Sequence, residues 1–558
     1  MSLFCITQSV EDAGIVKKDY DSIFPQKSSV YQLSNRLFLT AAPGFREKIA
    51  YKMVGNDQIF VFGTIFCESG FTDGILEQVN DCAAFMEALK GHQQNYYGHY
   101  IVVGFQAEKQ RLEIITDRVG CLNVYYACSG DEGQICIGND LYEVSRISRN
   151  TALDAQAVGE FLMTESNVNE RTFFQNVVRL GLGKELFYEN DRLFECSAYE
   201  YRIEHLTIEE YTKRIDRYFR WIDRYGKEIE VDISGGYDTR LIASLAHQSL
   251  SAYTGFSAGN RFDGGIDAEL SPIIADLLGI VCHNLDYADI PVMEELSELI
   301  WHGTSCLRDS GRSKRLPILF SYRYKAGDLS LGGYGGEVMR AKYNIYPDLK
   351  QFISYYYKGY EAEKICGIRN YQQNVREELE AYPEPQMLPG YMIQNWYYAM
   401  AKMRIWGSGF IQMGSLYGDI IHPFMDWFLM GPVFGFPLEE LKHGKLQDQI
   451  IQKYAPELKD IPYNKHINAA DNPVKHDRLE KILASNWEIR HIFQYARMKY
   501  SYTRESRSLK EKRQIKDSMA VNGLDLDRLL YRSGTSTSSR MTHILNVKRS
   551  LDAKCAQN

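Results

Sequence analysis

The chain has 558 residues, of which 45% are hydrophobic and 24% are charged, and its formal net charge is −8. This length exceeds one ordinary core, so we expect at least two folded domains and little disorder. The negative net charge argues against general binding of nucleic acid. The 11 cysteines include no C-x-x-C pair, which argues against a zinc centre or a disulfide framework and suits a reducing compartment.

No apolar run reaches the length of about 18 residues that a membrane span needs. The first residues also lack the basic flank and apolar run of a secretory signal. We therefore expect a cytoplasmic protein that has no membrane partner. The short apolar stretch from Trp427 to Phe436 contains Gly and Pro, and it is predicted to be a buried helix end followed by a loop.

The chain is predicted to change character near residue 204. Before it, short apolar runs separated by polar turns predict strands at 59–66, 100–105, 112–116, 124–127 and 135–138. After it, Thr207 to Tyr225 is predicted to be an amphipathic helix, and strands then alternate with helices as in a parallel α/β sheet. Beyond about residue 345, Tyr-, Leu- and Met-rich stretches predict an all-helical remainder. We expect one domain over 1–203 and another over 204–558.

A glycine-containing turn gives the strongest local signal. Ser234-Gly-Gly-Tyr-Asp-Thr-Arg240 follows the alternating strand 229–233 and precedes the helical run that starts at Leu241. Glycines let the backbone approach an anion, and a helix N-terminus offers free N–H groups to it. Ser234 and Thr239 can add hydroxyl donors, and Asp238 can hold Mg²⁺. The loop lacks the G-x-x-x-x-G-K-[ST] pattern, so it is not a Walker P-loop.

This loop resembles the pyrophosphate loop of the asparagine synthetase family, S-G-G-x-D-[ST]. Ala252-Tyr-Thr-Gly-Phe-Ser257 resembles the next strand of that family, which holds adenine, and Asp267-Ala-Glu-Leu270 with Ala275-Asp-Leu-Leu-Gly279 resembles its D-E…A…LG helix. The resemblance implies an α/β ATPase domain that cleaves ATP between the α and β phosphates. It implies that ATP is bound by Ile233, Ser234, Gly235, Gly236, Asp238, Thr239, Gly255, Phe256, Gly332 and Gly333.

A second glycine-rich segment, Gly332-Gly-Tyr-Gly-Gly-Glu337, resembles the family's G-x-G-[GS]-D-E loop. The resemblance implies that Glu337 binds Mg²⁺ together with Asp238. The family's second acid is replaced by Val338, which is a departure from the pattern. From the residues alone, Glu337 could instead be an acid that interacts with a helix dipole.

Two later segments extend the resemblance. The segment Asp419-Ile-Ile-His-Pro-Phe-Met-Asp426 resembles the family's E-x-R-x-P-F-L-D motif. In this chain the segment could shape the substrate cleft or pack in the core, and the two alternatives are equal. Ile461-Pro-Tyr-Asn-Lys465 resembles the segment that ends in the family's functional lysine. Lys465 would then stabilise the charge that develops as an adenylate becomes an amide.

The front of the chain resembles the family's glutaminase half, an α+β Ntn-hydrolase-like β-sandwich layered with helices. The match runs through 98–103, 115–126 and 173–183. That half requires a Cys at the mature N-terminus, where this chain reads Met1-Ser2, and Cys5 would need an unusual cleavage. The Asn-Gly of the family is Phe62-Gly63 here. We therefore expect a degenerate glutaminase domain that does not hydrolyse glutamine.

The nitrogen must then come from another amine. β-Lactam synthetases and lasso-peptide cyclases have similarly degenerate front halves, and Tyr334 stands where β-lactam synthetases have a Tyr that works with a Glu to deprotonate the amine. The Glu expected on the helix 396–406 is absent, since Ala401 stands there, so either another acid replaces it or Tyr334 only packs.

These observations predict an ATP- and Mg²⁺-dependent carbon–nitrogen ligase that adenylates a carboxylate of a small molecule or peptide and joins it to an amine. Three alternatives remain: a lactam or macrolactam cyclase, amidation with ammonia, and a nucleotide-binding pseudoenzyme. The catalytic candidates are Tyr334 and Lys465. No nucleic-acid partner is expected, and a homodimer is left open.

Overall fold

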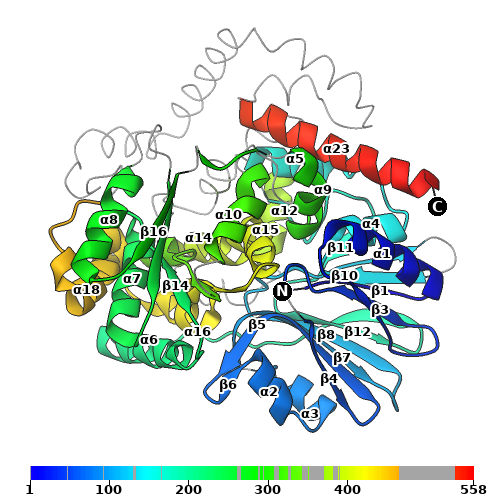
Figure 1. Cartoon of the computed structure of the whole chain (residues 1–558), viewed down its shortest axis with the longest axis horizontal. Coiled ribbons are helices and arrows are strands. Elements are labelled where there is room, and N and C mark those ends of the chain that lie inside the picture. Colours follow the sequence, from blue (N-terminus) through cyan, green and yellow to red (C-terminus); the bar gives the residue numbers. More distant parts are fainter. Residues whose placement is uncertain are drawn as a thin grey trace.

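The computed structural model describes most of the chain, in which two antiparallel sheets precede a parallel one (Figure 1). The described residues are 2–463 and 535–557, apart from 47, 92, 130–133, 165, 260–265, 287–288, 293, 307–312, 325–327, 342–349, 351–352, 354–369, 381–387 and 389.

The two antiparallel sheets are built from the first 200 residues. In spatial order, the first contains β11 (Val177–Arg179), β9 (Tyr125–Ser129), β10 (Gln134–Gly138), β1 (Leu3–Thr7), β3 (Phe38–Ala42) and β2 (Ser29–Gln32). The second contains β13 (Arg192–Ser197), β12 (Lys184–Glu189), β8 (Arg111–Thr116), β7 (Tyr97–Gln106), β5 (Asp57–Cys67) and β4 (Ala50–Val54), with β6 (Gly70–Phe71) paired to β5.

These sheets pack face to face and carry helices on their outer sides. Phe4 of β1 stacks on Phe62 of β5 with ring centroids 4.4 Å apart, so the two inner faces share one core. Helix α1 (Val10–Ile23) packs on β1 and β3, while α2 (Thr72–Gln78) and α3 (Cys82–Ala88) pack on β5. The layers are therefore helix, sheet, sheet and helix. Two more helices, α4 (Leu141–Ile147) and α5 (Ala155–Thr164), follow β10.

The parallel sheet begins after a capped helix. Helix α6 (Ile208–Asp223) starts at Thr207, whose side chain accepts a hydrogen bond from the Glu210 N–H while the Glu210 carboxylate accepts one from the Thr207 N–H. The sheet has the order β16 (Cys282–Asp286), β15 (Thr254–Gly259), β14 (Ile229–Asp232), β17 (Leu329–Leu331) and β18 (Asp419–Ile421), all parallel.

Helices lie beside this sheet and between it and the front half, as the green and yellow ribbons of Figure 1 show. They include α7 (Tyr237–Ser249), α8 (Ile266–Leu278), α9 (Ser297–Gly303), α10 (Leu316–Arg323), α12 (Tyr371–Glu380), α14 (Gly390–Tyr397), α15 (Arg404–Ser415), α16 (Trp427–Met430), α17 (Leu438–Leu441) and α18 (Lys445–Tyr454). A π-helical segment, η7 (Tyr398–Met403), joins α14 to α15. The last helix, α23 (Thr535–Gln557), contacts α4 and α5.

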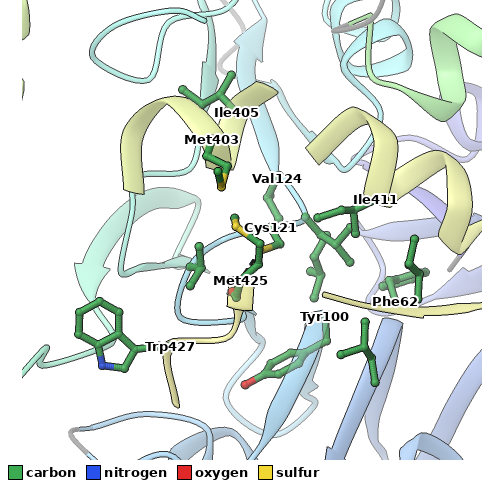
Figure 2. Packing of buried hydrophobic residues seen from close by; sticks show 14 of the residues in the cluster. Phe62, Tyr100, Cys121, Val124, Met403, Ile405, Ile411, Met425 and Trp427 are labelled. Atoms are coloured by element: carbon green, nitrogen blue, oxygen red, sulfur yellow. Dashed lines mark hydrogen bonds between the residues drawn. The ribbon is translucent and has the colours of Figure 1, made fainter. Parts of the chain in front are cut away.

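The core is continuous between the two halves of the chain. Figure 2 shows Phe62, Tyr100, Cys121 and Val124 of the front half beside Met403, Ile405, Ile411, Met425 and Trp427 of the back half, and all of these side chains are buried. Two buried carboxylates cross the same boundary. Asp419 accepts hydrogen bonds from Arg46 and Thr64, and Asp426 accepts one from the Gly98 N–H at 2.8 Å.

Most of the predicted elements are confirmed. The five predicted strands of the front half are β5, β7, β8, β9 and β10, and the predicted amphipathic helix is α6. In the segment 427–436, the buried short helix is confirmed, but the residues expected to form a loop after it are the 3-10 helix η9 (Gly431–Gly435). The prediction of an all-helical remainder after residue 345 is wrong at β18, because a strand of three buried residues is too short to show a periodic pattern.

The mixed α and β character is confirmed. The identification of the front half with an Ntn-hydrolase-like fold, and of the back half with a pyrophosphate-loop ATPase, stays a prediction. None of the helices in the described part of the chain combines the length and the apolar character that crossing a bilayer requires.

Candidate functional site

The two glycine-rich loops meet at the carboxyl edge of the parallel sheet. Residues 233–236 follow β14, and residues 332–335 follow β17, which pairs directly with β14. The chain runs outward from β14 through β15 to β16 and then returns to β17 on the other side of β14. This reversal of strand order marks a topological switch point, the place where open α/β sheets bind their ligands.

The first loop presents hydrogen-bond donors toward an acid. The Gly235 N–H donates to Asp267 Oδ1 at 2.9 Å, and the Gly236 N–H donates to Ser234 Oγ at 3.2 Å. The Ser234 and Thr239 hydroxyls are 2.5 Å apart. Helix α7 begins directly after Gly236, so its positive end faces the same place. A carboxylate therefore already binds to a loop N–H that suits an anion.

The second loop packs so closely on the first that its glycines cannot be replaced freely. A Cβ on Gly333 would lie 2.7 Å from the carbonyl carbon of Asp238 and from the Thr239 nitrogen, and one on Gly336 would lie 2.6 Å from Asp238 Oδ1. Gly335 has a φ of +96°, which side chains rarely adopt. The sequence pattern of the second loop thus follows from its contact with Asp238.

Asp238 and Glu337, the two predicted metal ligands, lie within electrostatic reach of each other. Burial, followed by the negative charge of Asp238, raises the pKa of Glu337 above its ordinary value. Asp238 Oδ2 accepts a hydrogen bond from Arg340 Nη2 at 2.6 Å, and Oδ1 accepts one from Gln447 Nε2 at 3.0 Å. Gln447 also donates to the Gly336 carbonyl at 2.9 Å, which ties Asp238 to the second loop.

The π-helical segment η7 connects both loop residues to the helical part of the chain. Tyr398, its first residue, donates its hydroxyl to Glu337 Oε1 at 2.9 Å. Tyr334 donates its hydroxyl to the Met403 carbonyl at 3.2 Å and fits over Gly407, where a Cβ would lie 2.2 Å from its ring. The Tyr334 hydroxyl thus donates to a main-chain carbonyl on the helix where a Glu was expected. A π turn shifts side chains out of the α-helical register, and such turns are common at functional sites.

The predicted adenine-binding strand is packed inside the sheet. The Ile233 N–H donates to the Phe256 carbonyl at 2.8 Å. A Cβ on Gly255 would lie 2.8 Å from Ile233 Cγ1, so the glycine is required by packing between neighbouring strands. Phe256 is buried beneath the Arg323 guanidinium, which is 5.1 Å from the ring centroid.

The predicted Lys465 lies outside the described residues, but the segment before it is held at the first loop. The Tyr463 ring stacks on Tyr237 with centroids 3.6 Å apart, and its hydroxyl donates to Asp448 at 2.6 Å. Buried Arg240 donates to the carbonyls of Ile461 and Pro462 at 2.7 and 2.9 Å. These contacts hold residues 461–463 beside the start of helix α7.

The side chains around the two loops fit a divalent cation. Asp238 and Glu337 supply the carboxylate oxygens that Mg²⁺ prefers. Burial and, after it, the negative charge of Asp238 raise the pKa of Glu337, and a cation between the two carboxylates would offset both the burial of charge and the repulsion.

A second group of potential metal ligands does not fit. A ring nitrogen of His99, a carboxylate oxygen of Asp117 and Sγ of Cys121 lie within 4.8 Å of one another, and all three residues are buried. However, His99 Nε2 accepts the His422 N–H at 2.9 Å, so a neutral ring carries its proton on Nδ1. Neither ring nitrogen then offers a free lone pair to a metal, since the lone pair of Nε2 accepts the His422 N–H. Asp117 also accepts the N–H groups of Val119 and Cys121, which is a turn-forming role.

The thiol of Cys5, which could act as the nucleophile only after an unusual cleavage, is inaccessible in this structure. Cys5 lies on β1, is fully buried, and its Sγ is 3.5 Å from Sγ of Cys136. The contact with Cys136, together with burial, raises the pKa of the Cys5 thiol well above its usual range. A buried thiol that resists ionisation is a poor nucleophile.

No protein-family model matches the chain, and no curated protein matches it either.

Sequence reasoning missed three residues that complete the site. Arg340 and Gln447 hold the two oxygens of Asp238, and Tyr398 holds Glu337. A signal for Arg340 was present, because it stands three residues after Glu337 on one helical turn, η5 (Gly336–Arg340). Gln447 comes from the distant helix α18, and no local sequence pattern predicts its contact with Asp238.

Proposed function

We propose that the chain uses ATP and Mg²⁺ to adenylate a substrate carboxylate and then joins the acyl group to an amine that does not come from glutamine. The observation that carries this proposal is the contact between the two loops, in which Gly336 presses on Asp238 and Glu337 follows directly. A phosphate-type loop and a carboxylate pair at one switch point are what a pyrophosphate-releasing enzyme needs.

In the proposed reaction, a carboxylate oxygen of the substrate attacks the α-phosphorus of ATP, and the bond between the α-phosphorus and the bridging oxygen breaks to release pyrophosphate. The amine nitrogen then attacks the acyl carbon, the acyl–oxygen bond breaks, and AMP leaves. The amine proton must pass to a base. Mg²⁺, when bound, would neutralise phosphate charge.

Residues of this chain have distinct roles in the proposal. Asp238 and Glu337 would hold the metal, and Gln447 and Tyr398 would keep these carboxylates in place. The Gly235 and Gly236 N–H groups and the hydroxyls of Ser234 and Thr239 would bind pyrophosphate, for which Asp267 must release the Gly235 N–H. Lys465 would stabilise the charge on the reacting carbonyl, since residues 461–463 are held at the same loop.

The buried Cys5 supports an amine source other than glutamine. The amine could belong to a second molecule or to the same substrate, which would give a lactam or macrolactam. The hydrogen bond from Tyr334 to the Met403 carbonyl stabilises the tyrosine as a donor and does not favour it as the base.

The test is pyrophosphate release from Mg·ATP with a panel of amino acids and short peptides. We expect release well above the carboxylate-free rate for at least one acid, and we expect Asp238→Asn to abolish it because the metal loses a charged ligand. Asp276→Asn, an exposed residue of α8, is the matched control and should keep wild-type activity. Equal release by Asp238→Asn and the wild type would refute the proposed site.

A further inference from the structure

Arg340 binds one of the two carboxylate oxygens of Asp238, the predicted metal ligand. Its Nη2 is 2.6 Å from Asp238 Oδ2, while Asp238 Oδ1 is held separately by Gln447. One carboxylate oxygen is thus fixed by a neutral amide and the other is neutralised by a guanidinium. Only the second oxygen, Oδ2, can bind a cation without loss of the Gln447 contact that positions Asp238.

The ion pair is open to an incoming ligand. The side chains of Arg340 and Asp238 are 23% and 22% exposed, so the pair is not locked into the core. The guanidinium lies over the Tyr237 ring, 5.4 Å from its centroid, and Tyr237 is the first residue of α7. The positive charge of Arg340 therefore stands beside the N–H groups of the first loop.

One donor of this side chain is unsatisfied. The Arg340 Nε–H is buried and has no hydrogen-bond partner among the described residues. A buried donor without a partner is costly, and an oxygen atom of a ligand would remove that cost. The oxygen that best matches a guanidinium beside a glycine loop belongs to a phosphate.

We propose that Arg340 is a phosphate-binding residue that exchanges partners. In the nucleotide-free protein it neutralises Asp238. When a metal ion binds Asp238 Oδ2, Arg340 moves to the β and γ phosphates of ATP, which leave as pyrophosphate. This inference rests on the proposed function, because it needs Asp238 to be a metal ligand. Arg340 adds a residue that acts on the leaving pyrophosphate, where negative charge accumulates.

The exchange predicts that loss of the guanidinium raises the affinity for the metal ion and lowers the affinity for the nucleotide. In Arg340→Gln, the guanidinium no longer competes for Asp238, so Mn²⁺ should bind the nucleotide-free protein more tightly, by about threefold or more. The same variant should bind ATP in the presence of Mg²⁺ about tenfold more weakly, because one charge-assisted hydrogen bond to phosphate is lost. Arg340→Lys keeps the charge and should recover part of the ATP affinity.

The experiment uses the full chain, electron paramagnetic resonance for free Mn²⁺, and calorimetry for Mg·ATP. Arg36→Gln, an exposed residue of the front half, is the control with the same change of net charge, and Asp238→Asn reports on the metal site itself. Unchanged Mn²⁺ affinity in Arg340→Gln, with Mn²⁺ binding lost in Asp238→Asn, would overturn the exchange alone. Undiminished Mn²⁺ binding in Asp238→Asn would refute the metal site and with it the proposed function.

Discussion

At the scale of single residues, the candidate site depends on glycines as much as on its acids. Gly333 and Gly336 bring one loop against the other, and the space for any side chain there is filled by Asp238 and Thr239. The geometry of the carboxylate pair is thereby set by close main-chain packing. Side chains that could rotate would hold it less firmly.

Gly333→Ala tests this dependence. Its Cβ would lie 2.7 Å from main-chain atoms of Asp238 and Thr239, which cannot rotate away, so the loops must separate. We expect the variant to fold and its carboxylate-dependent pyrophosphate release to fall by at least about tenfold, the effect of about 1.4 kcal/mol of lost transition-state stabilisation.

The matched control is Gly74→Ala in α2, where an added Cβ meets nothing within 4 Å. It should keep full activity and raise the free energy of unfolding by about 0.5–1 kcal/mol, because Ala loses less backbone entropy than Gly on folding. Wild-type activity in Gly333→Ala would show that the contact between the loops does not set the site.

At the scale of elements, helices α12 and α14 are joined through a buried acid near η7. The Tyr397 hydroxyl donates to Glu378 Oε2 at 2.5 Å. Burial, aided by the charge of Glu170, raises the pKa of Glu378 from an ordinary value of 4.5 to about 7. The folded protein therefore holds this proton more tightly than the unfolded chain does.

The sign of the pH effect follows directly. The stability that Glu378 contributes is fully present below about pH 4.5 and is lost as the pH rises toward 7. Glu378→Gln cannot titrate, so its stability relative to the wild type should increase over that range, by at most on the order of 3 kcal/mol. Urea unfolding at a series of pH values measures this, with exposed Glu380→Gln as the control. Parallel pH profiles for Glu378→Gln and the wild type would contradict the assignment.

At the scale of the whole molecule, hydrogen bonds from the front half hold buried carboxylates of the back half in place. Asp419 and Asp426 of the parallel-sheet region bind Arg46, Thr64 and the Gly98 N–H of the front half. The C-terminal helix α23 returns to the same half, where Ser550 lies 2.7 Å from the Tyr142 hydroxyl. Of the two alternatives for 419–426, these contacts favour core packing between the halves over shaping of a cleft.

Much of the fold near the site was predictable from the sequence. A strand, a glycine turn and a helix leave a local pattern, so β14, the loop after it and α7 were predicted from adjacent residues. The capping box of α6 also lies within four consecutive residues. Such elements depend on interactions between near neighbours in the chain.

Other parts of the site could not be predicted because they depend on distant residues. Gln447 reaches Asp238 from a helix more than 200 positions away, at a sequence separation of 209. Tyr398 reaches Glu337 from a π-helical turn, and no hydrophobic period indicates where such a turn will interrupt an α-helix. The sequence suggested a Glu partner for Tyr334, whereas the structure places the Met403 carbonyl at its hydroxyl.

The most direct measurement of the proposed chemistry follows an oxygen atom. The protein is given Mg·ATP, an amine and a pool of amino acids and short peptides whose carboxylates carry ¹⁸O, and the nucleotide product is examined by mass spectrometry. Because the substrate carboxylate would attack the α-phosphorus and later leave its oxygen behind, the account predicts AMP that carries one ¹⁸O atom. Unlabelled AMP, or ADP with the label in free phosphate, would contradict it.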